Sequence, residues 1–105
     1  MPTTTIAGHE VEVNEEGFLT QPDQWSEDLA PELARLIGLD PLTDAHWTLI
    51  RFLRDDYAVM HETATLRRVS TRSGTPVKEI FTLFPGKPAK KLAYVSGLPK
   101  PKGCV

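Results

Sequence analysis

The feature that most constrains this fold is a stripe of apolar residues in the middle of the chain, spaced by three and four positions. It consists of Trp47, Ile50, Leu53, Tyr57 and Met60. This spacing places side chains on one face of an α-helix and predicts one long amphipathic helix. Thr43 is the expected N-cap, Asp44 favours the first turn, and the helix is expected to fade near 61–63. The stripe indicates a core face rather than a ligand-binding motif, so other helices must cover it.

Two further helices are expected, one before the long helix and one near the end of the chain. The first begins near Ser26, which can act as N-cap, and stops at Gly38. Pro31 falls in its first turns, so the helix is expected either to kink there or to begin a little later. Its apolar positions at helical spacing are Leu29, Leu33, Leu36 and Ile37. The second covers residues 88–95, with Leu92 and Val95 inward. Its lysines, which are expected to point outward, are Lys87, Lys90 and Lys91.

Residues 64–84 predict a pair of short helices that looks like a helix-turn-helix. The first helix begins at residues 64–69 and stops near Ser73 and Gly74. The second has Thr75 as its expected N-cap and Pro76 at its first helical position. Its expected buried face consists of Val77, Ile80, Phe81 and Phe84.

The N-terminal residues predict a small β-hairpin. Apolar and polar residues alternate over 5–13, residues 14–17 have turn composition, and Phe18 and Leu19 resume the apolar pattern. A two-stranded ribbon is only marginally stable alone, so it must pack on the helices.

The last ten residues are not expected to form a helix. Gly97 releases the backbone, Pro99 and Pro101 lack donors and favour an extended chain, and Gly103 frees the end. At about 3.1 Å per residue, an extended segment 96–105 reaches roughly 30 Å. The expected division is therefore a hairpin and helical body over 1–95 and a mobile arm over 96–105.

Cys104 is the single cysteine of the chain and stands second from its end. It has no partner for a disulfide within the chain, which indicates a reducing compartment. Lys100 and Lys102 lie within four residues of it, and their positive charges favour its thiolate form modestly. A single mobile thiol suits the acceptance of a sulfane sulfur as a persulfide and its delivery to a second thiol. The alternative, an incidental cysteine at a frayed end, stays open at this point.

Charge is divided unevenly along the sequence. Residues 1–65 carry three arginines against thirteen acidic residues, a net charge of −10, whereas residues 66–105 carry nine basic residues against Glu79 alone, a net charge of +8. Either the basic half meets an anionic partner, or the two halves offset each other on the folded surface. Arg67, Arg68 and Arg72 lie at helical spacing and can bind a phosphate backbone, dock an acidic partner or stay solvated. Lys90 and Lys91 are further candidates for docking.

Other residues predict no additional chemistry. The three histidines lack ligand spacing, so neither a metal nor a cofactor is expected, and His46 is interpreted as a helix-start or packing residue. Asp55 and Asp56 are expected on a solvated face. We expect neither a secretory signal nor a membrane-spanning segment, and therefore a cytoplasmic protein without membrane contact.

Short motifs along almost the whole chain match, in order, the DsrC/TusE/DsvC family of sulfur-relay proteins. The matching segments are 17–19, 24–26, 46–47, 51–55, Tyr57, 83–85, 88–90 and 97–105. The chain thus resembles this family, and its terminal segment is the most specific part of the match. The resemblance implies a mainly α fold: a small orthogonal helical bundle with a helix-turn-helix-like pair, an N-terminal hairpin and a flexible C-terminal arm. It also implies that Cys104 carries the sulfur.

Two departures from the family pattern bear on function. Members that serve dissimilatory sulfite reductase carry a second cysteine eleven positions before the last one, where this chain has Ala93. The stretch between Met60 and Phe84 is also shorter than expected, which can alter the choice of partner. The single-cysteine pattern is similar to TusE and implies a sulfurtransferase-type persulfide carrier rather than a stand-alone enzyme. Its implied partners are a TusBCD-like donor and the enzyme that thiolates the tRNA wobble uridine.

Two alternatives remain at this stage. One is a DsrC-like single-cysteine partner or regulator of a dissimilatory sulfite reductase or a sulfur-oxidation enzyme. The other is a regulator that binds nucleic acid through the helix-turn-helix-like pair.

Overall fold

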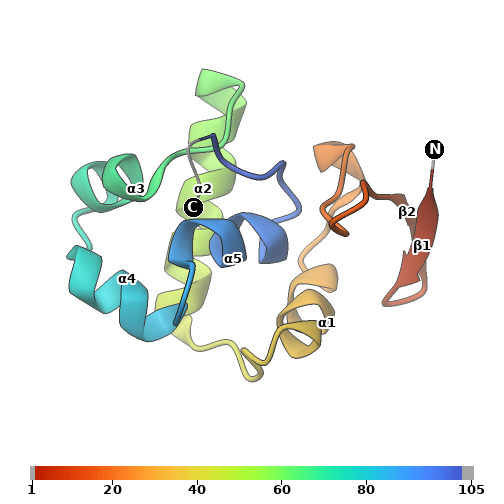
Figure 1. Cartoon of the computed structure of the whole chain (residues 1–105), viewed down its shortest axis with the longest axis horizontal. Coiled ribbons are helices and arrows are strands. Elements are labelled where there is room, and N and C mark those ends of the chain that lie inside the picture. The colour runs from red at the N-terminus through yellow and green to blue at the C-terminus, as the bar shows by residue number, and fades with distance from the viewer. Residues whose placement is uncertain (1, 103–105) are drawn as a thin grey trace.

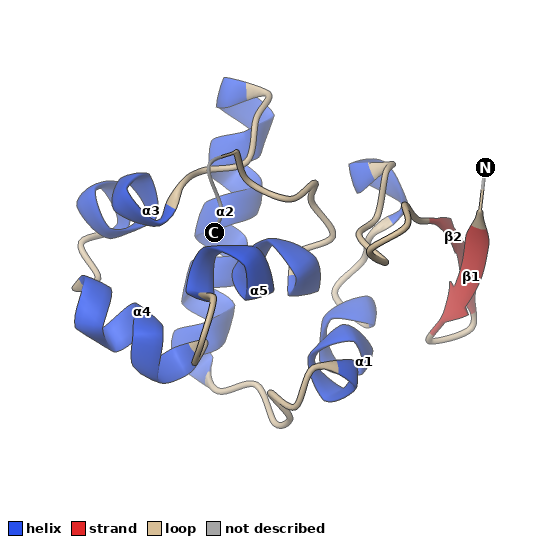
Figure 2. Ribbon diagram, in the orientation of Figure 1, coloured by secondary structure: helices blue, strands red, loops and turns tan. Residues whose placement is uncertain are grey.

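Helix α2 (Asp44–Met60) runs through the middle of the molecule, and two of the other helices pack directly on it (Figure 1). The structure is a computed structural model that describes residues 2–102. Helix α5 (Pro88–Val95) packs on both α2 and α1 (Leu29–Leu36), while α3 (Leu66–Ser73) bridges α2 and α4 (Val77–Leu83). Figure 2 shows these helices, a single 3₁₀ turn, η1 (Pro22–Gln24), and one hairpin in this part of the chain. The predicted fold class is confirmed.

The hairpin lies at one side of the helices and is joined to them by specific contacts (Figure 1). Strands β1 (Thr3–Ile6) and β2 (His9–Glu12) pair antiparallel, and the turn between them takes positive φ angles at residues 7 and 8. The hairpin therefore turns inside the run predicted at 5–13, and the turn predicted at 14–17 is a separate one, closed by the isolated antiparallel bridge Val13 to Leu19. The His9 ring lies 2.8 Å from the Asp28 carboxylate, so the ribbon packs on the helices as expected.

His46 ties the start of α2 to the end of α4. Its Nδ1 accepts the Thr43 backbone N–H at 3.0 Å, and the Thr43 hydroxyl accepts the His46 N–H, a reciprocal cap that confirms Thr43 as N-cap. Its Nε2 lies 2.8 Å from the Leu83 carbonyl, and its ring meets Phe84 edge-on at 5.1 Å. A neutral ring with its proton on Nε2 satisfies these contacts. His46 is thus a capping and packing residue, as predicted.

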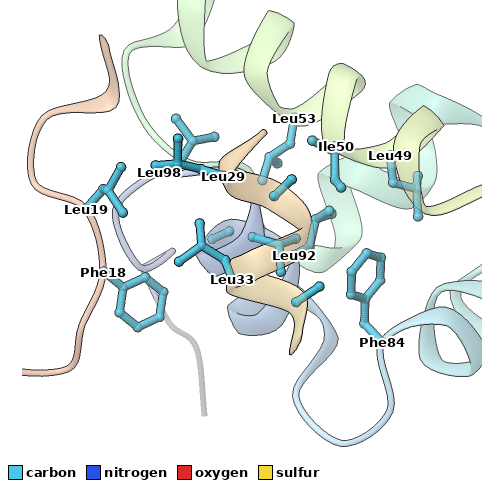
Figure 3. Packing of buried hydrophobic residues seen from close by; sticks show 14 of the residues in the cluster. Phe18, Leu19, Leu29, Leu33, Leu49, Ile50, Leu53, Phe84, Leu92 and Leu98 are labelled. Atoms are coloured by element: carbon cyan, nitrogen blue, oxygen red, sulfur yellow. The ribbon is translucent and has the colours of Figure 1, made fainter. Parts of the chain in front are cut away.

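One hydrophobic core joins the helices to the base of the hairpin (Figure 3). Ile50 and Leu53 of the predicted stripe are fully buried, and Trp47 and Tyr57 pack beside them. Four positions expected to be inward are instead exposed: Leu36, Met60, Val77 and Phe81. The first three stand at helix ends, and Phe81 lies on a short helix that α3 and α5 contact without covering its whole surface.

Two predicted N-caps are wrong. Helix α1 has Asp28 at its N-cap, and the Ser26 hydroxyl donates to the Asp28 carboxylate instead of capping the helix. Helix α4 has Pro76 at its N-cap, one residue later than expected, and the Thr75 carbonyl accepts from the Ser70 hydroxyl. For Ser26 the competing partner is a neighbouring side chain, the Asp28 carboxylate, which takes the hydroxyl that was expected to cap the helix. Pro31 stands in the first turn of α1, where its missing N–H has no intrahelical acceptor.

Candidate functional site

The segment that follows α5 turns back onto the body, and we call residues 96–99 the arm root. Gly97 takes a left-handed conformation with φ +69°. The Leu98 N–H donates to the Ala93 carbonyl at 3.1 Å, and the Gly97 N–H donates to the Tyr94 carbonyl at 3.3 Å. This pattern is a Schellman motif, which ends a helix and places the next apolar side chain against it. Leu98 is accordingly fully buried within the core (Figure 3).

Trp25 and Arg54 hold the arm root from the opposite side. The Trp25 indole N–H donates to the Val95 carbonyl at 2.9 Å, and the Arg54 guanidinium lies 4.3 Å from the centre of the Trp25 ring. Arg54 also donates to the Ser96 carbonyl at 2.7 Å and to the Pro22 carbonyl at 3.0 Å. Burial lowers the pKa of the Arg54 guanidinium, which still stays charged at neutral pH.

Two further contacts continue along the segment beyond Gly97. The Thr63 hydroxyl donates to the Pro99 carbonyl at 2.7 Å, and the Lys100 ammonium lies 3.3 Å from the Glu16 carboxylate. Pro101 is buried as well. While Pro99 is held, Cys104 follows it by five positions, which limits the distance between their Cα atoms to about 17 Å rather than the expected 30 Å. Mobility of the whole segment 96–105 stays a prediction.

Gly103 and Cys104 lie outside the described residues. Covalent geometry alone keeps the Cα of Cys104 within about 7 Å of the Lys102 Cα, because two residues span no more than that. The surroundings of Lys102 are therefore the part of the body that lies nearest to the thiol.

Lys102 and Pro101 line a hollow of about 470 Å³ between α3, α4 and the start of α5, here called the α3–α5 hollow. Its apolar lining residues are Leu66, Phe81, Pro88, Ala89 and Pro101. Its basic lining residues are Arg67, Lys87 and Lys102, all of them exposed. In Figure 1 the blue segment after α5 turns back and crosses near the C-terminal end of α2.

The predicted docking residues do not form one cluster. Arg67 lies at the hollow and Arg72 is exposed elsewhere on α3, whereas Lys90 and Lys91 line a second hollow of about 390 Å³ with Tyr94. Arg68 differs from both groups, because its side chain is only 19% exposed and belongs to the body.

Asp56 is the partner that holds Arg68 in place. The Arg68 guanidinium donates to its carboxylate at 2.8 Å and lies 3.6 Å from the Glu62 carboxylate. Asp56 is 8% exposed, so its predicted place on a solvated face is wrong. Asp55 is exposed as expected. A buried ion pair between α2 and α3 cannot be read from either helix alone, since each residue also fits a polar surface.

Sequence reasoning missed Trp25, Arg54 and Thr63 as residues of this site. Trp25 and Arg54 did lie in segments that matched the family pattern, and this was the one available signal. Over residues 2–102, no three His, Cys, Asp or Glu side chains gather as metal ligands do, and no helix is long and apolar enough to cross a bilayer. The expected absence of a cofactor stays a prediction.

Comparison with known proteins gives a consistent result along the whole chain. The sequence profile of the family described as DsrC like protein matches residues 5–105. The chain is 34% identical to the dissimilatory-type sulfite reductase subunit gamma of Nitratidesulfovibrio vulgaris, with both chains fully covered. It is also 34% identical to sulfurtransferase TusE of Escherichia coli, over 93% of this chain and 95% of that one.

A solved structure agrees with these sequence matches. The NMR structure of Allochromatium vinosum DsrC superposes with a TM-score of 0.85 at 34% identity, over 98% of this chain and 97% of that one. Fold, sequence profile and full-length relatives point to the same group, as the motifs of the sequence indicated. The chain therefore belongs to the family of DsrC-like proteins.

Proposed function

We propose that this protein is a sulfur carrier of a sulfur relay, with Cys104 as the residue that carries the sulfur. The Cys104 thiolate attacks the outer sulfur of a donor persulfide. A new S–S bond forms on Cys104, the donor's S–S bond breaks, and the donor leaves as a thiolate, so that no external oxidant or reductant is needed. In the second step an acceptor thiolate attacks the outer sulfur of the Cys104 persulfide, and Cys104 leaves as a thiolate.

The observation that carries this proposal is the single cysteine together with Ala93. Ala93 is fully buried in α5, and its carbonyl accepts the N–H that closes the arm root. Without a second thiol the chain cannot release its sulfur by closing an internal disulfide. The carried sulfur must therefore go to an acceptor outside the chain, and this is the task of a carrier rather than of a stand-alone enzyme.

The relatives support two sulfur pathways, of which we favour tRNA wobble-uridine 2-thiolation. The name sulfurtransferase TusE belongs to several relatives that cover nearly all of this chain. On this pathway the donor is a TusBCD-like complex, the acceptor is the tRNA-thiolating enzyme, any tRNA contact is indirect, and the protein works in the cytoplasm without a membrane. The second candidate is a DsrC-like single-cysteine partner of a sulfite reductase or sulfur-oxidation enzyme, since a gamma subunit is equally similar.

Nucleic-acid binding by α3 and α4 receives less support. Of the three arginines proposed for it, Arg68 is held by Asp56 and Glu62 within the body. This leaves Arg67 and Arg72 as the exposed arginines of α3, and few phosphate contacts imply weak binding.

The experiment is to incubate the purified protein with a persulfide donor and measure the intact mass. We expect a gain of one sulfur atom, removed again by a thiol reductant, and no gain for Cys104→Ser with unchanged far-UV circular dichroism. Transfer is then followed to a purified tRNA-thiolating enzyme and, in parallel, to a sulfite reductase. Absence of added sulfur on Cys104 in the wild-type protein refutes the carrier function.

A further inference from the structure

We propose that the α3–α5 hollow docks an acidic protein segment that inserts an apolar side chain, so that the partner's thiol meets Cys104. The proposal rests on the carrier function above, and it adds the surface and the chemistry of the partner. It requires an interior that suits an apolar group, a rim that suits acidic groups, and a position near the thiol.

The interior of the hollow suits an apolar side chain. Its walls come from three separate parts of the chain: Leu66 of α3, Phe81 of α4, and Pro88 and Ala89 of α5, with Pro101 closing the side next to the terminus. Phe81 is 44% exposed, a large aromatic surface left in contact with water. Exposed apolar surface rimmed by polar residues is typical of interaction sites, and about 470 Å³ is room enough for a large side chain.

The rim of the hollow suits carboxylates. Its charged lining residues are Arg67, Lys87 and Lys102, and no Asp or Glu is among the lining residues. Lys87 also borders the second hollow, which Lys90 and Lys91 line together with Glu16. The Glu16 carboxylate of this second hollow lies 3.3 Å from the Lys100 ammonium, so its charge is already paired with a cation. The basic character of residues 66–105 is thus concentrated around the two hollows, where it attracts an acidic surface.

The position of the hollow links it to the chemistry of Cys104. Two of its lining residues, Pro101 and Lys102, stand immediately before the terminal residues. Since Cys104 follows Lys102 by two positions, its Cα lies within about 7 Å of the Lys102 Cα in any conformation. A partner whose thiol reaches Cys104 must therefore stand over or beside this hollow while residue 102 lies there.

An acidic protein segment fits these features better than a nucleic acid does. A phosphate backbone uses the cations of the rim but leaves an apolar interior unfilled. A peptide with acidic residues around a leucine or phenylalanine uses both at once, because the apolar anchor supplies buried area and the acids supply orientation.

The test titrates the isotopically labelled full chain with three synthetic peptides and, separately, with tRNA, by backbone NMR. The first peptide has leucines flanked by glutamates, the second keeps the leucines but replaces glutamate by lysine, and the third keeps the glutamates but replaces leucine by glycine. We expect the first alone to bind measurably and to shift the amide signals of Leu66, Ala89 and Lys102. Equal binding of the leucine-free acidic peptide overturns the proposal, as does tighter binding of tRNA with the same signals shifted.

Variants of exposed residues then locate the surface. Phe81→Ala and Arg67→Glu are each expected to weaken binding of the first peptide by about fivefold or more. Lys78→Glu is the matched control, because Lys78 is an exposed cation on the same helix as Phe81 but does not line the hollow. An equal loss of binding in Lys78→Glu shows a non-specific charge effect and overturns the proposal.

Cys104→Ser separates this proposal from the carrier function. The docking surface predicts that Cys104→Ser binds the first peptide as the wild type does. If Cys104 gains no sulfur while the peptide still binds with the expected pattern, the carrier function fails and the docking surface stands. Loss of peptide binding in Cys104→Ser overturns the docking surface.

Discussion

Gly97→Ala is the substitution that tests most directly how the arm root is held. A Cβ built on Gly97 lies 2.3 Å from Trp25 Cδ1, 2.5 Å from Cγ and 2.6 Å from Cβ, all far below van der Waals contact. The φ of +69° adds a second cost, because an alanine rarely adopts this conformation. Either Trp25 must move away or the arm root must leave the body.

Both movements raise the free energy of the folded state. Moving Trp25 breaks its hydrogen bond to the Val95 carbonyl, about 1 kcal/mol, and its contact with Arg54, about 1 kcal/mol. Releasing the arm root instead exposes Leu98, about 2 kcal/mol. On the first route the substituted residue keeps the left-handed φ, which costs about 1 kcal/mol more. The second route relieves that φ but breaks the hydrogen bond from Arg54 to the Ser96 carbonyl, also about 1 kcal/mol, so either route costs about 3 kcal/mol. We expect Gly97→Ala to lose about 3 kcal/mol of the free energy of unfolding.

Gly74→Ala is the matched control. Gly74 has φ +79°, and a Cβ built on it meets no atom within 4 Å, so its substitution carries the conformational cost alone, about 1 kcal/mol. Urea denaturation followed by circular dichroism gives the free energy of unfolding for both variants. In a Trp47→Phe background Trp25 is the single tryptophan, and its fluorescence shows whether the indole becomes exposed to water.

The difference between the two variants, about 2 kcal/mol, measures the contact between Gly97 and Trp25. If Gly97→Ala loses no more stability than Gly74→Ala, the indole yields without cost and the arm root is not clamped.

Two other perturbations follow from the same packing. Thr63→Val keeps the side-chain volume but removes the donor to the Pro99 carbonyl. We expect a loss of about 1–2 kcal/mol by urea denaturation and faster tryptic cleavage after Lys102, since trypsin does not cleave before Pro101. Unchanged cleavage contradicts the role of Thr63 as an anchor. Burial raises the pKa of the Tyr94 phenol above its ordinary value, because the folded state disfavours the phenolate. The stabilisation is therefore complete below the unfolded pKa near 10 and is lost as the pH rises through the higher folded pKa. Tyr94→Phe should flatten the stability profile above pH 10, and a parallel profile in both proteins refutes this.

The sequence by itself determined the helices, most of their ends and the hairpin. The spacing of Ile50 and Leu53, the cap at Thr43 and the stop near residue 61 all depend on local backbone and side-chain geometry, which a periodic pattern records. The matching motifs also indicated the family, and through it Cys104 as the candidate residue for sulfur transfer.

Only the tertiary structure decided how the terminal segment is held and what surrounds it. Trp25 and Val95 are 70 positions apart, Arg54 and Ser96 are 42 apart, and Thr63 and Pro99 are 36 apart, so no local pattern records these hydrogen bonds. A glycine followed by prolines is compatible with a free C-terminal tail. It is equally compatible with a helix that ends at the glycine and continues as an extended segment packed on the body. The choice between these conformations depends on Trp25 and Thr63, two residues from distant parts of the chain that contact the arm root in the fold.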